Sequence, residues 1–190
     1  MVLNIEKRFN EIIQLLEKSK SMQTEILNVS DQIINCLEKD GKVIVMGNGG
    51  SAADSQHFVA EFIGRYKIER KSIAAIALTT DTSIITAIGN DYEFEQIFSR
   101  QCESLAKHND ILIAISTSGN SKNIVKALKE SQKKVAKIVG ITGEKKGKME
   151  KYCDIVLKIP SKDTPQIQEV HRIVLHMICE IVEKKIFENS

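Results

Sequence analysis

Five consecutive apolar residues, Ile-Leu-Ile-Ala-Ile at positions 111–115, lead directly into the hydroxyl-rich segment 116–121, Ser-Thr-Ser-Gly-Asn-Ser. A strand without polar alternation is typical of a parallel sheet that helices cover on both faces. The segment 116–121 is therefore expected to form the loop at the carboxyl end of such a strand. We expect a helix to open at Ser121 or Lys122 and to run to about Gln132, as in folds where strands and helices alternate.

The rest of the chain repeats this alternation from residue 42 onward. Short β-branched or apolar runs predict four further strands, at residues 42–46, 73–78, 137–142 and 154–159. Helical patterns separate them, at residues 52–64, 81–88, 94–106, near 149 and at 166–187. The pattern predicts an α/β fold of three layers, a parallel sheet with helices on both faces.

Apolar residues at helical spacing also fill the segment 3–39, which predicts an N-terminal helical extension. Ser30-Asp31 can restart a helix, so this segment is either two helices or one interrupted helix. Its apolar face exceeds what one sheet needs, which hints at helix packing between subunits. Because we find no linker or repeat, we expect one domain over residues 1–190, with a helical region at 1–40 and an α/β core at 41–190.

The composition narrows the class of protein. Hydrophobic residues make up 42% and charged residues 27% of the chain, the balance of a soluble globular protein. The formal net charge is +2 and basic residues are interspersed with acidic ones, which argues against a nucleic-acid partner. No segment approaches the ~20 apolar residues of a membrane span, and the charged N-terminus lacks the apolar region of a signal peptide. We therefore expect a cytoplasmic protein with no membrane partner.

The hydroxyl-rich loop has the composition of a phosphate site. Ser116, Thr117, Ser118 and Ser121 offer four hydroxyl donors within six residues, and Gly119 lets the backbone turn closely around an oxyanion. A helix N-terminus adds unpaired N–H groups and the positive end of the helix dipole. N-capping by one of these side chains is the simpler alternative, but it accounts for one hydroxyl rather than four.

A second candidate site lies on the helix after the first strand, which ends in Gly-Asn-Gly-Gly-Ser at residues 47–51. His57 and Glu61 are four residues apart on that helix, so their side chains share one face. An imidazole and a carboxylate at this spacing can chelate one divalent metal ion. A surface His–Glu contact is the usual explanation for such a pair, but its position just past a glycine-rich strand end favours a site.

Together these motifs resemble those of the phosphoheptose isomerases, a family of sugar isomerase (SIS) domain proteins. The resemblance rests on Gly47-Asn48-Gly49-Gly50-Ser51, His57, Glu61, the loop at 116–121, Ile167-Gln168-Glu169 and His176, which span essentially the whole chain. It implies the flavodoxin-like SIS fold and the conversion of sedoheptulose 7-phosphate to D-glycero-D-manno-heptose 7-phosphate, toward ADP-heptose and the lipopolysaccharide core. It also implies a homotetramer with sites between subunits and one zinc ion per subunit.

The resemblance further implies which residues bind the sugar phosphate. Besides the four hydroxyl residues of the loop, these are Asn48, Gly49, Gly50, Ser51, Glu61, Asn90, Asp91 and Gln168. By themselves, Asn90 and Asp91 are ordinary turn residues. One position departs from the family pattern, since Gln166 stands where an arginine commonly precedes the Ile-Gln-Glu triplet.

Converting a 2-ketose to an aldose moves a hydrogen between C1 and C2, which needs a base at carbon and an acid/base at the oxygens. Glu61 is the better candidate for the base, because a carboxylate near apolar surface becomes more basic, and His176 can move the oxygen proton. The resemblance implies His57, Glu61, Gln168 and His176 as zinc ligands. Gln168 and His176 lie eight residues apart, ~12 Å along a helix. Either they reach the ion from both sides, or different subunits supply different ligands.

Two other functions stay open. A non-catalytic SIS module that binds a replication-initiation protein would share the loops but lack the acidic residue at position 61 and the histidine at position 176, whereas this chain has both. An isomerase of another sugar phosphate would keep the chemistry, since nothing in the sequence measures sugar length. On the last helix, His171 and Glu169 either contact the site residues or lie at the surface, and we favour the surface.

Overall fold

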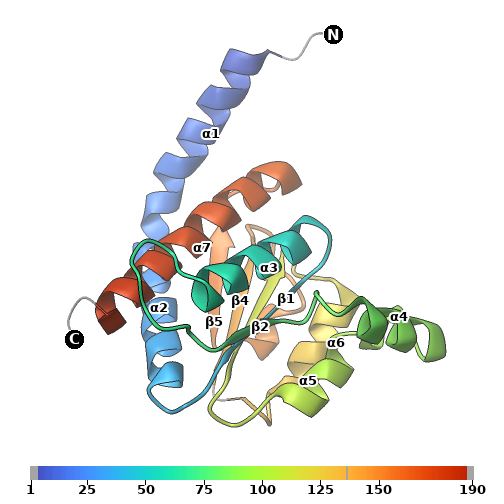
Figure 1. Ribbon diagram of the computed structural model, residues 1–190. Helices are drawn as coiled ribbons and strands as arrows, with labels where there is room; N and C mark the ends of the chain where they lie inside the picture. The colour runs from blue at the N-terminus through green and yellow to red at the C-terminus, as the bar shows by residue number, and fades with distance from the viewer. Residues whose placement is uncertain (1–3, 136, 188–190) are drawn as a thin grey trace.

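A five-stranded parallel sheet forms the centre of the computed structural model, which describes residues 4–135 and 137–187 (Figure 1). The strand order is β2-β1-β3-β4-β5, and every neighbouring pair is parallel. The strands are β1 (Val43–Gly47), β2 (Ala75–Ala77), β3 (Ile111–Ser116), β4 (Lys137–Gly143) and β5 (Ile155–Ile159). This is the order of a doubly wound, flavodoxin-like sheet, so the predicted fold class is confirmed.

Helices cover both faces of this sheet. They are α1 (Ile5–Ser19), α2 (Gln23–Leu37), α3 (Gly50–Ile63), α4 (Thr82–Asp91), α5 (Ser99–Leu105), α6 (Lys122–Ser131) and α7 (Thr164–Phe187), with the 3₁₀ turns η1 (Lys20–Met22), η2 (Phe94–Gln96) and η3 (Glu150–Tyr152). One apolar layer joins α2, α3 and α7 to one face of the strands, and a second joins α5 and α6 to the other. Strands β1 and β3 are buried along their whole length, which explains why their sequences lack polar alternation.

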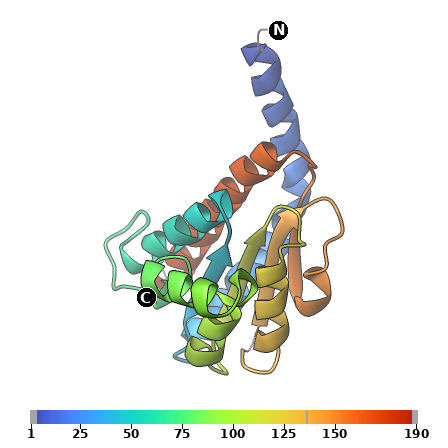
Figure 2. The ribbon, with the colours of Figure 1, turned by 90° about the vertical axis from the view of Figure 1, so that its right-hand side faces the viewer.

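Helix α1 projects away from the rest of the molecule in both views (Figures 1 and 2). The Asn4 side chain caps it by accepting a hydrogen bond from the Lys7 N–H at 2.9 Å. Ile5, Phe9 and Ile13 are 65%, 66% and 56% exposed, so a single chain leaves this apolar stripe uncovered. Among the described helices, none is long and apolar enough to cross a membrane.

The N-terminal helical region breaks at a different place from the predicted one. Helix α2 continues through Ser30 and Asp31, and the buried Ser30 hydroxyl donates to the Ile26 carbonyl at 2.9 Å. The break falls at η1 instead, beside Ser19, whose hydroxyl donates to the Leu15 carbonyl at 2.8 Å. Because a serine hydroxyl can bond to the preceding turn inside a helix as well as at its end, serine alone does not fix a boundary.

Two other elements differ from their predicted extents. The strand expected at 73–78 is limited to β2, an edge strand that pairs only with β1. The helix expected at 94–106 is divided into η2 and α5, and the residues at the join, Ile97 and Phe98, are 2% and 1% exposed. The chain bends there because both side chains enter the apolar layer beneath α6.

The two loops that the sequence singled out lie side by side at the carboxyl edge of the sheet. Strands β1 and β3 pair so that Gly47 lies opposite Ile115. Just beyond the strand ends, the side-chain amides of Asn48 and Asn123 exchange two hydrogen bonds of 2.9 Å each. The turn after β1 is thereby tied to the first turn of α6, at the edge where parallel sheets bind ligands.

Candidate active site

The loop between β3 and α6 has the open backbone of an anion site. Gly119 has a φ of +63°, a conformation that favours glycine. The hydroxyls of Ser116 and Ser121 lie 3.3 Å apart, and the Ser118 hydroxyl accepts from the Asn120 N–H at 3.1 Å. Ser121 is the N-cap residue of α6, yet its side chain makes no capping bond. N-capping therefore does not account for the four hydroxyls, and the positive end of α6 faces the loop.

The segment that follows β4 braces this loop from one side. The Met149 N–H donates to the Gly119 carbonyl at 3.0 Å, and the Lys148 N–H donates to the Asn120 side-chain oxygen at 3.0 Å. A Cβ at Gly147 would lie 2.5 Å from the Gly119 Cα atom, which is closer than non-bonded contacts of real Cβ atoms. The two glycines thus let two backbones touch, and the contact fixes the shape of the loop.

The turn after β1 also relies on close contact. Gly49 has a φ of +55° and is the N-cap residue of α3. A Cβ at Gly50 would lie 2.6 Å from the Gln168 Nε2 atom, so the Gln168 side chain rests directly on the Gly50 backbone. The structure therefore brings together two of the residues predicted to bind substrate, Gly50 and Gln168, from α3 and α7.

Three predicted residues, His57, Glu61 and His176, form a tight cluster between α3 and α7. The Nε2 atoms of His57 and His176 are 2.8 Å apart, and the His57 Nε2 atom lies 3.4 Å from the Glu61 carboxylate. One donor atom from each residue lies within 4.8 Å of the other two. The Glu61 side chain is 20% exposed and that of His57 is 43% exposed, so the cluster is open to a small ligand.

Helices α3 and α7 run side by side at a nearly constant offset in sequence. Gly50 meets Gln168, Asp54 pairs with Arg172, and His57 meets His176 two turns further along. This register explains the eight-residue spacing of Gln168 and His176. His176 reaches the cluster, whereas Gln168 lies at the first turn of α3, about 12 Å away along the axis of α7.

Asn90 and Asp91 lie elsewhere in the single chain. Both are exposed in the last turn of α4, and the Asn90 amide donates to the Asp91 carboxylate at 2.8 Å. Figure 1 shows α4 on the opposite side of the molecule from α7. One chain therefore does not bring these two residues to the cluster, and their part in binding stays a prediction.

Two histidines of α7 have a lowered pKa, for related reasons. Burial and the neighbouring His57 lower the pKa of His176, whereas the Glu61 carboxylate acts in the opposite direction. His171 was expected at the surface, and this was wrong: it is fully buried, and burial lowers its pKa to about 4. The Thr142 backbone acts in the opposite direction, but burial outweighs it.

Sequence reasoning missed several residues that surround the cluster. Tyr66 lies with its ring centroid 5.7 Å from that of His176. Asp54, one turn before His57 on α3, accepts a hydrogen bond from Arg172 at 2.8 Å. No local pattern indicates such contacts, since they depend on how α3, α7 and the segment after α3 pack.

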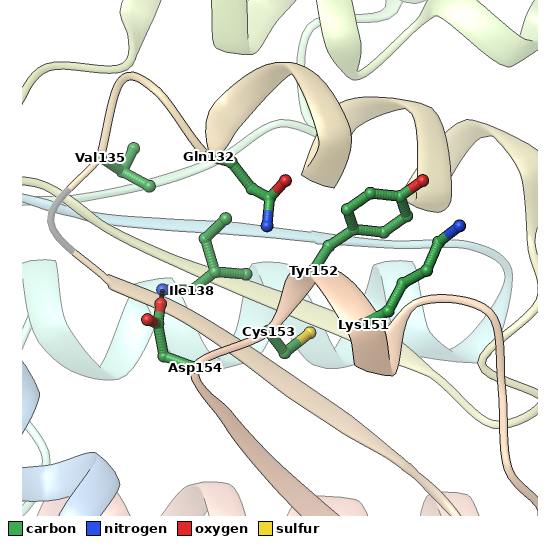
Figure 3. Close-up of a pocket in the computed structure, with 7 residues that line it drawn as sticks. All are labelled: Gln132, Val135, Ile138, Lys151, Tyr152, Cys153 and Asp154. Atoms are coloured by element: carbon green, nitrogen blue, oxygen red, sulfur yellow. Dashed lines mark hydrogen bonds between the residues drawn. The ribbon is translucent and has the colours of Figure 1, made fainter.

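The pocket drawn in Figure 3 is separate from this site. It has a volume of about 140 Å³ and is lined by residues that include Gln132, Ile138 and Asp154. Ile138 lies near the start of β4, and Asp154 comes just before β5. The pocket is therefore at the amino edge of the sheet, the edge opposite the loops that follow the strands.

Comparison with known proteins gives consistent matches. The SIS domain family model matches residues 8–143. The chain is 48% identical to the phosphoheptose isomerase of Helicobacter hepaticus, over 98% of this chain and 95% of that protein. It is 47% identical to phosphoheptose isomerase 1 of Campylobacter jejuni, over 97% and 99%. The solved structure of phosphoheptose isomerase GmhA from Neisseria gonorrhoeae has a TM-score of 0.87 at 38% identity, covering 95% of this chain and 97% of that chain. A phosphoheptose isomerase from Francisella tularensis has a TM-score of 0.91 at 36% identity, covering 95% and 96%.

Proposed function

The chain belongs to the phosphoheptose isomerase family of SIS-domain proteins, and on that premise we propose that it converts sedoheptulose 7-phosphate to D-glycero-D-manno-heptose 7-phosphate. The reaction is an aldose–ketose isomerisation. The observation that supports it most directly is the meeting of His57, Glu61 and His176, on elements that start at the same edge of the sheet as the hydroxyl-rich loop. A module that only binds a protein has no need of this acid–base cluster.

The phosphate of the substrate binds at Ser116, Thr117, Ser118 and Ser121, where hydroxyls and the N-terminus of α6 offer hydrogen-bond donors without a charged side chain. His57 lies seven residues into α3, about 10 Å from its start. The loop and the cluster are thus separated along α3. This separation suits a sugar held by its phosphate at one end and altered at C1 and C2 at the other.

Glu61 acts as the base at carbon. Its carboxylate removes a proton from C1 of the ketose, and the enediol that results takes a proton back at C2 to give the aldose. Arg70 donates a hydrogen bond to the Glu61 backbone carbonyl at 2.7 Å, which fixes the backbone from which the Glu61 side chain extends. A base held in place in this way needs little rearrangement during the reaction.

His176 moves the proton between the two substrate oxygens. Its lowered pKa keeps the ring neutral near pH 7, so one ring nitrogen donates while the other accepts. As C1 loses its proton, the carbonyl oxygen at C2 gains one, and the hydroxyl at C1 gives one up as C2 is protonated. A neutral imidazole can carry out both transfers.

The cluster also fits a zinc ion. Zinc takes imidazole nitrogens and carboxylate oxygens as ligands, and these three donor atoms lie within 4.8 Å of one another. We propose that His57, Glu61 and His176 hold one zinc ion per subunit. Gln168 of the same chain rests on Gly50, about 12 Å along α7 from this cluster, so as the candidate fourth ligand Gln168 would come from another subunit. When bound, zinc supplies Lewis-acid polarisation of the substrate oxygens. A carboxylate has two oxygens and an imidazole has two nitrogens, so Glu61 and His176 can each bind the ion through one atom and move a proton through the other.

A homotetramer with sites at its subunit interfaces completes the proposal. The uncovered stripe on α1 supports it, and so do Ile84, Tyr92 and Phe94 near α4, which are 38%, 53% and 61% exposed. A neighbouring subunit would also account for Asn90 and Asp91, which belong to α4, on the opposite side of the molecule from α7 (Figure 1). We place the enzyme in the cytoplasm, where the product would lead toward ADP-heptose and the lipopolysaccharide core.

Incubation of the purified protein with sedoheptulose 7-phosphate tests the proposal, with ¹³C NMR to detect the aldose phosphate. Pentose and hexose ketose phosphates tested in parallel measure the preference for sugar length. His176→Ala is expected to abolish conversion, whereas His108→Ala, at an exposed position before β3, leaves it unchanged. Failure to convert any of the ketose phosphates contradicts the proposed function.

A further inference from the structure

The cluster of His57, Glu61 and His176 lies between two ion pairs that connect α7 with α3 and with the segment after α3. On one side, Arg172 donates two hydrogen bonds to Asp54, at 2.8 Å and 3.2 Å, and the Asp54 side chain is 2% exposed. On the other side, Arg70 and Glu183 meet at 2.8 Å, with side chains 1% and 3% exposed. The proposed reaction centre thus lies between a half-exposed ion pair, in which Arg172 is 56% exposed, and a fully buried one.

Arg70 closes the C-terminus of α3. Its guanidinium donates to the carbonyl of Glu61 at 2.7 Å and to that of Phe62 at 2.9 Å. Carbonyls in the last turn of a helix have no partner within the helix. Arg70 supplies one for Glu61, and it shares the Phe62 carbonyl with the Ile73 N–H, which donates at 3.0 Å. One of the two carbonyls belongs to Glu61 itself, which makes Arg70 a direct support of the proposed base.

Glu183 holds the segment that follows α3, residues 64–71. Its two carboxylate oxygens accept from the backbone N–H groups of Tyr66, Lys67 and Ile68 at 3.0, 2.7 and 3.2 Å. Burial alone would raise the pKa of Glu183, but these donors and Arg70 outweigh it and lower the pKa. Glu183 therefore stays ionised and ties segment 64–71 to α7.

Segment 64–71 in turn carries Tyr66 to the reaction centre. The Tyr66 ring lies 5.7 Å from the His176 ring at an interplanar angle of 35°. The His57 ring lies 5.1 Å from the His176 ring, in an edge-on arrangement. His176 is thereby bounded by one ring from segment 64–71 and by another from α3, which leaves its imidazole little freedom to turn.

We propose that Arg70 and Glu183 are positioning residues, whose buried ion pair sets the spacing of Glu61 and His57 against His176. The pair fixes α3 to α7 through the Glu61 carbonyl, and it holds Tyr66 on the His176 ring. Neither residue touches the substrate. For its effect on turnover the inference rests on the proposed function, whereas its effect on the histidine pair stands on geometry alone.

The character of the pair agrees with this role. A buried ion pair adds little net stability compared with well-packed apolar side chains, so stability alone is a weak reason for placing two charges in the core. The planar Arg70 guanidinium instead joins several elements at once, because its Nε atom donates to Glu183 at 2.8 Å while its terminal nitrogens donate to the backbone carbonyls of Glu61 and Phe62. Misplacement of a reacting group by about 1 Å lowers turnover by ~10²-fold, so an arrangement fixed in this way matters at the cluster.

Glu183→Gln and Arg70→Lys test the inference. In the metal-free protein, ¹⁵N imidazole spectra report which ring nitrogens of His57 and His176 carry protons, and the 2.8 Å contact requires one donor and one acceptor. We expect Glu183→Gln to abolish that paired pattern and to lower kcat by about 10²-fold, with KM within about threefold because the phosphate loop is untouched. Arg70→Lys keeps the charge but loses the planar guanidinium with its several N–H donors, and we expect a loss of roughly tenfold in kcat.

Lys185→Ala is the matched control, since Lys185 also forms an ion pair from α7, with Asp31 at 2.6 Å, but in an exposed position. It should leave kcat and the imidazole spectra unchanged. The inference is overturned if Glu183→Gln folds and shows wild-type kcat and imidazole spectra, because the pair then only stabilises the fold. If Glu183→Gln does not fold, the same result for Arg70→Lys overturns the inference. Should the wild-type protein prove inactive on every sugar phosphate, the proposed function fails, and the imidazole spectra still decide the positioning role.

Discussion

The phosphate loop and the acid–base cluster are built in opposite ways. The loop is made of six consecutive residues, 116–121, and its binding groups are neutral hydroxyls and backbone N–H groups. The cluster is made of ionisable side chains, and His57 and His176 are 119 residues apart in the chain. The loop depends on local backbone conformation, whereas the cluster depends on how two helices pack. We therefore expect changes in the loop to alter binding and changes in the cluster to alter turnover.

Glu61→Gln should separate the two regions most sharply. The substitution keeps the size of the side chain and removes the base, so kcat is expected to fall by about 10³-fold, within the range of general base catalysis. Because the phosphate loop is unchanged, KM should stay within about threefold of the wild-type value. Steady-state kinetics with sedoheptulose 7-phosphate measure both. Glu130→Gln, at an exposed position on α6, is the control, and an equal loss in both variants would contradict the assignment.

Acid should weaken the packing of α7, because His171 is buried there in its neutral form with a pKa of about 4. In the unfolded chain a histidine has a pKa of ~6.5, so the unfolded state binds the proton more readily as the pH falls. The contribution of His171 to the free energy of unfolding is then fully present above pH 6.5, and about 3 kcal/mol of it is lost as the pH falls toward 4. Urea unfolding between pH 7 and 4 measures this loss. His171→Gln should show a smaller loss over the same range, and an unchanged pH dependence would contradict the assignment.

The double substitution Ser116→Ala/Ser121→Ala should affect the loop alone. Hydrogen bonds to charged groups contribute about 1.5–3 kcal/mol, so KM is expected to rise by roughly 10- to 100-fold. The chemical step is untouched, and kcat should remain within about threefold. Ser104→Ala, at an exposed position on α5, is the control. A fall in kcat without a rise in KM would mean that the loop takes part in the chemistry.

Gly119→Ala should cost a smaller amount, through the backbone of the loop. The φ of +63° is strained for alanine, and the new Cβ would lie 3.0 Å from the Gly147 Cα atom. We expect a loss of about 1–2 kcal/mol in the free energy of unfolding. Gly89→Ala, in α4 with no atom within 4 Å of the added Cβ, should instead stabilise the protein by about 0.5–1 kcal/mol. Thermal or urea unfolding of both variants checks the contrast.

The difference between local contacts, as in the loop, and long-range contacts, as in the cluster, also explains which features the sequence can predict. The alternation of strands and helices, the hydroxyl-rich loop and the pairing of His57 with Glu61 follow from local patterns, because each depends on residues close together in the chain. The meeting of His57 with His176 follows only from the resemblance to a family. The burial of His171 and the Arg70–Glu183 pair depend on the register between α3 and α7, which no spacing within one helix encodes.

Two helix boundaries were predicted wrongly because they too depend on long-range packing. Ser30 carries the local mark of a helix end, but its hydroxyl bonds inside α2, which packs against α7. The helix expected at 94–106 divides where Ile97 and Phe98 turn into the apolar layer. In both cases tertiary burial decided the structure where local preference was weak.

The loop is proposed to bind the phosphate while the cluster carries out the chemistry. Calorimetric titration of the Glu61→Gln variant with sedoheptulose 7-phosphate and with inorganic phosphate tests this most directly. The titrations are repeated after Ser116→Ala/Ser121→Ala is added in the same background. If the loop holds the phosphate and the cluster performs the chemistry, Glu61→Gln binds both ligands, and the added changes weaken both by a similar factor, roughly 10- to 100-fold. Unchanged affinity for inorganic phosphate after the loop substitutions would contradict the assignment of residues 116–121 as the phosphate site.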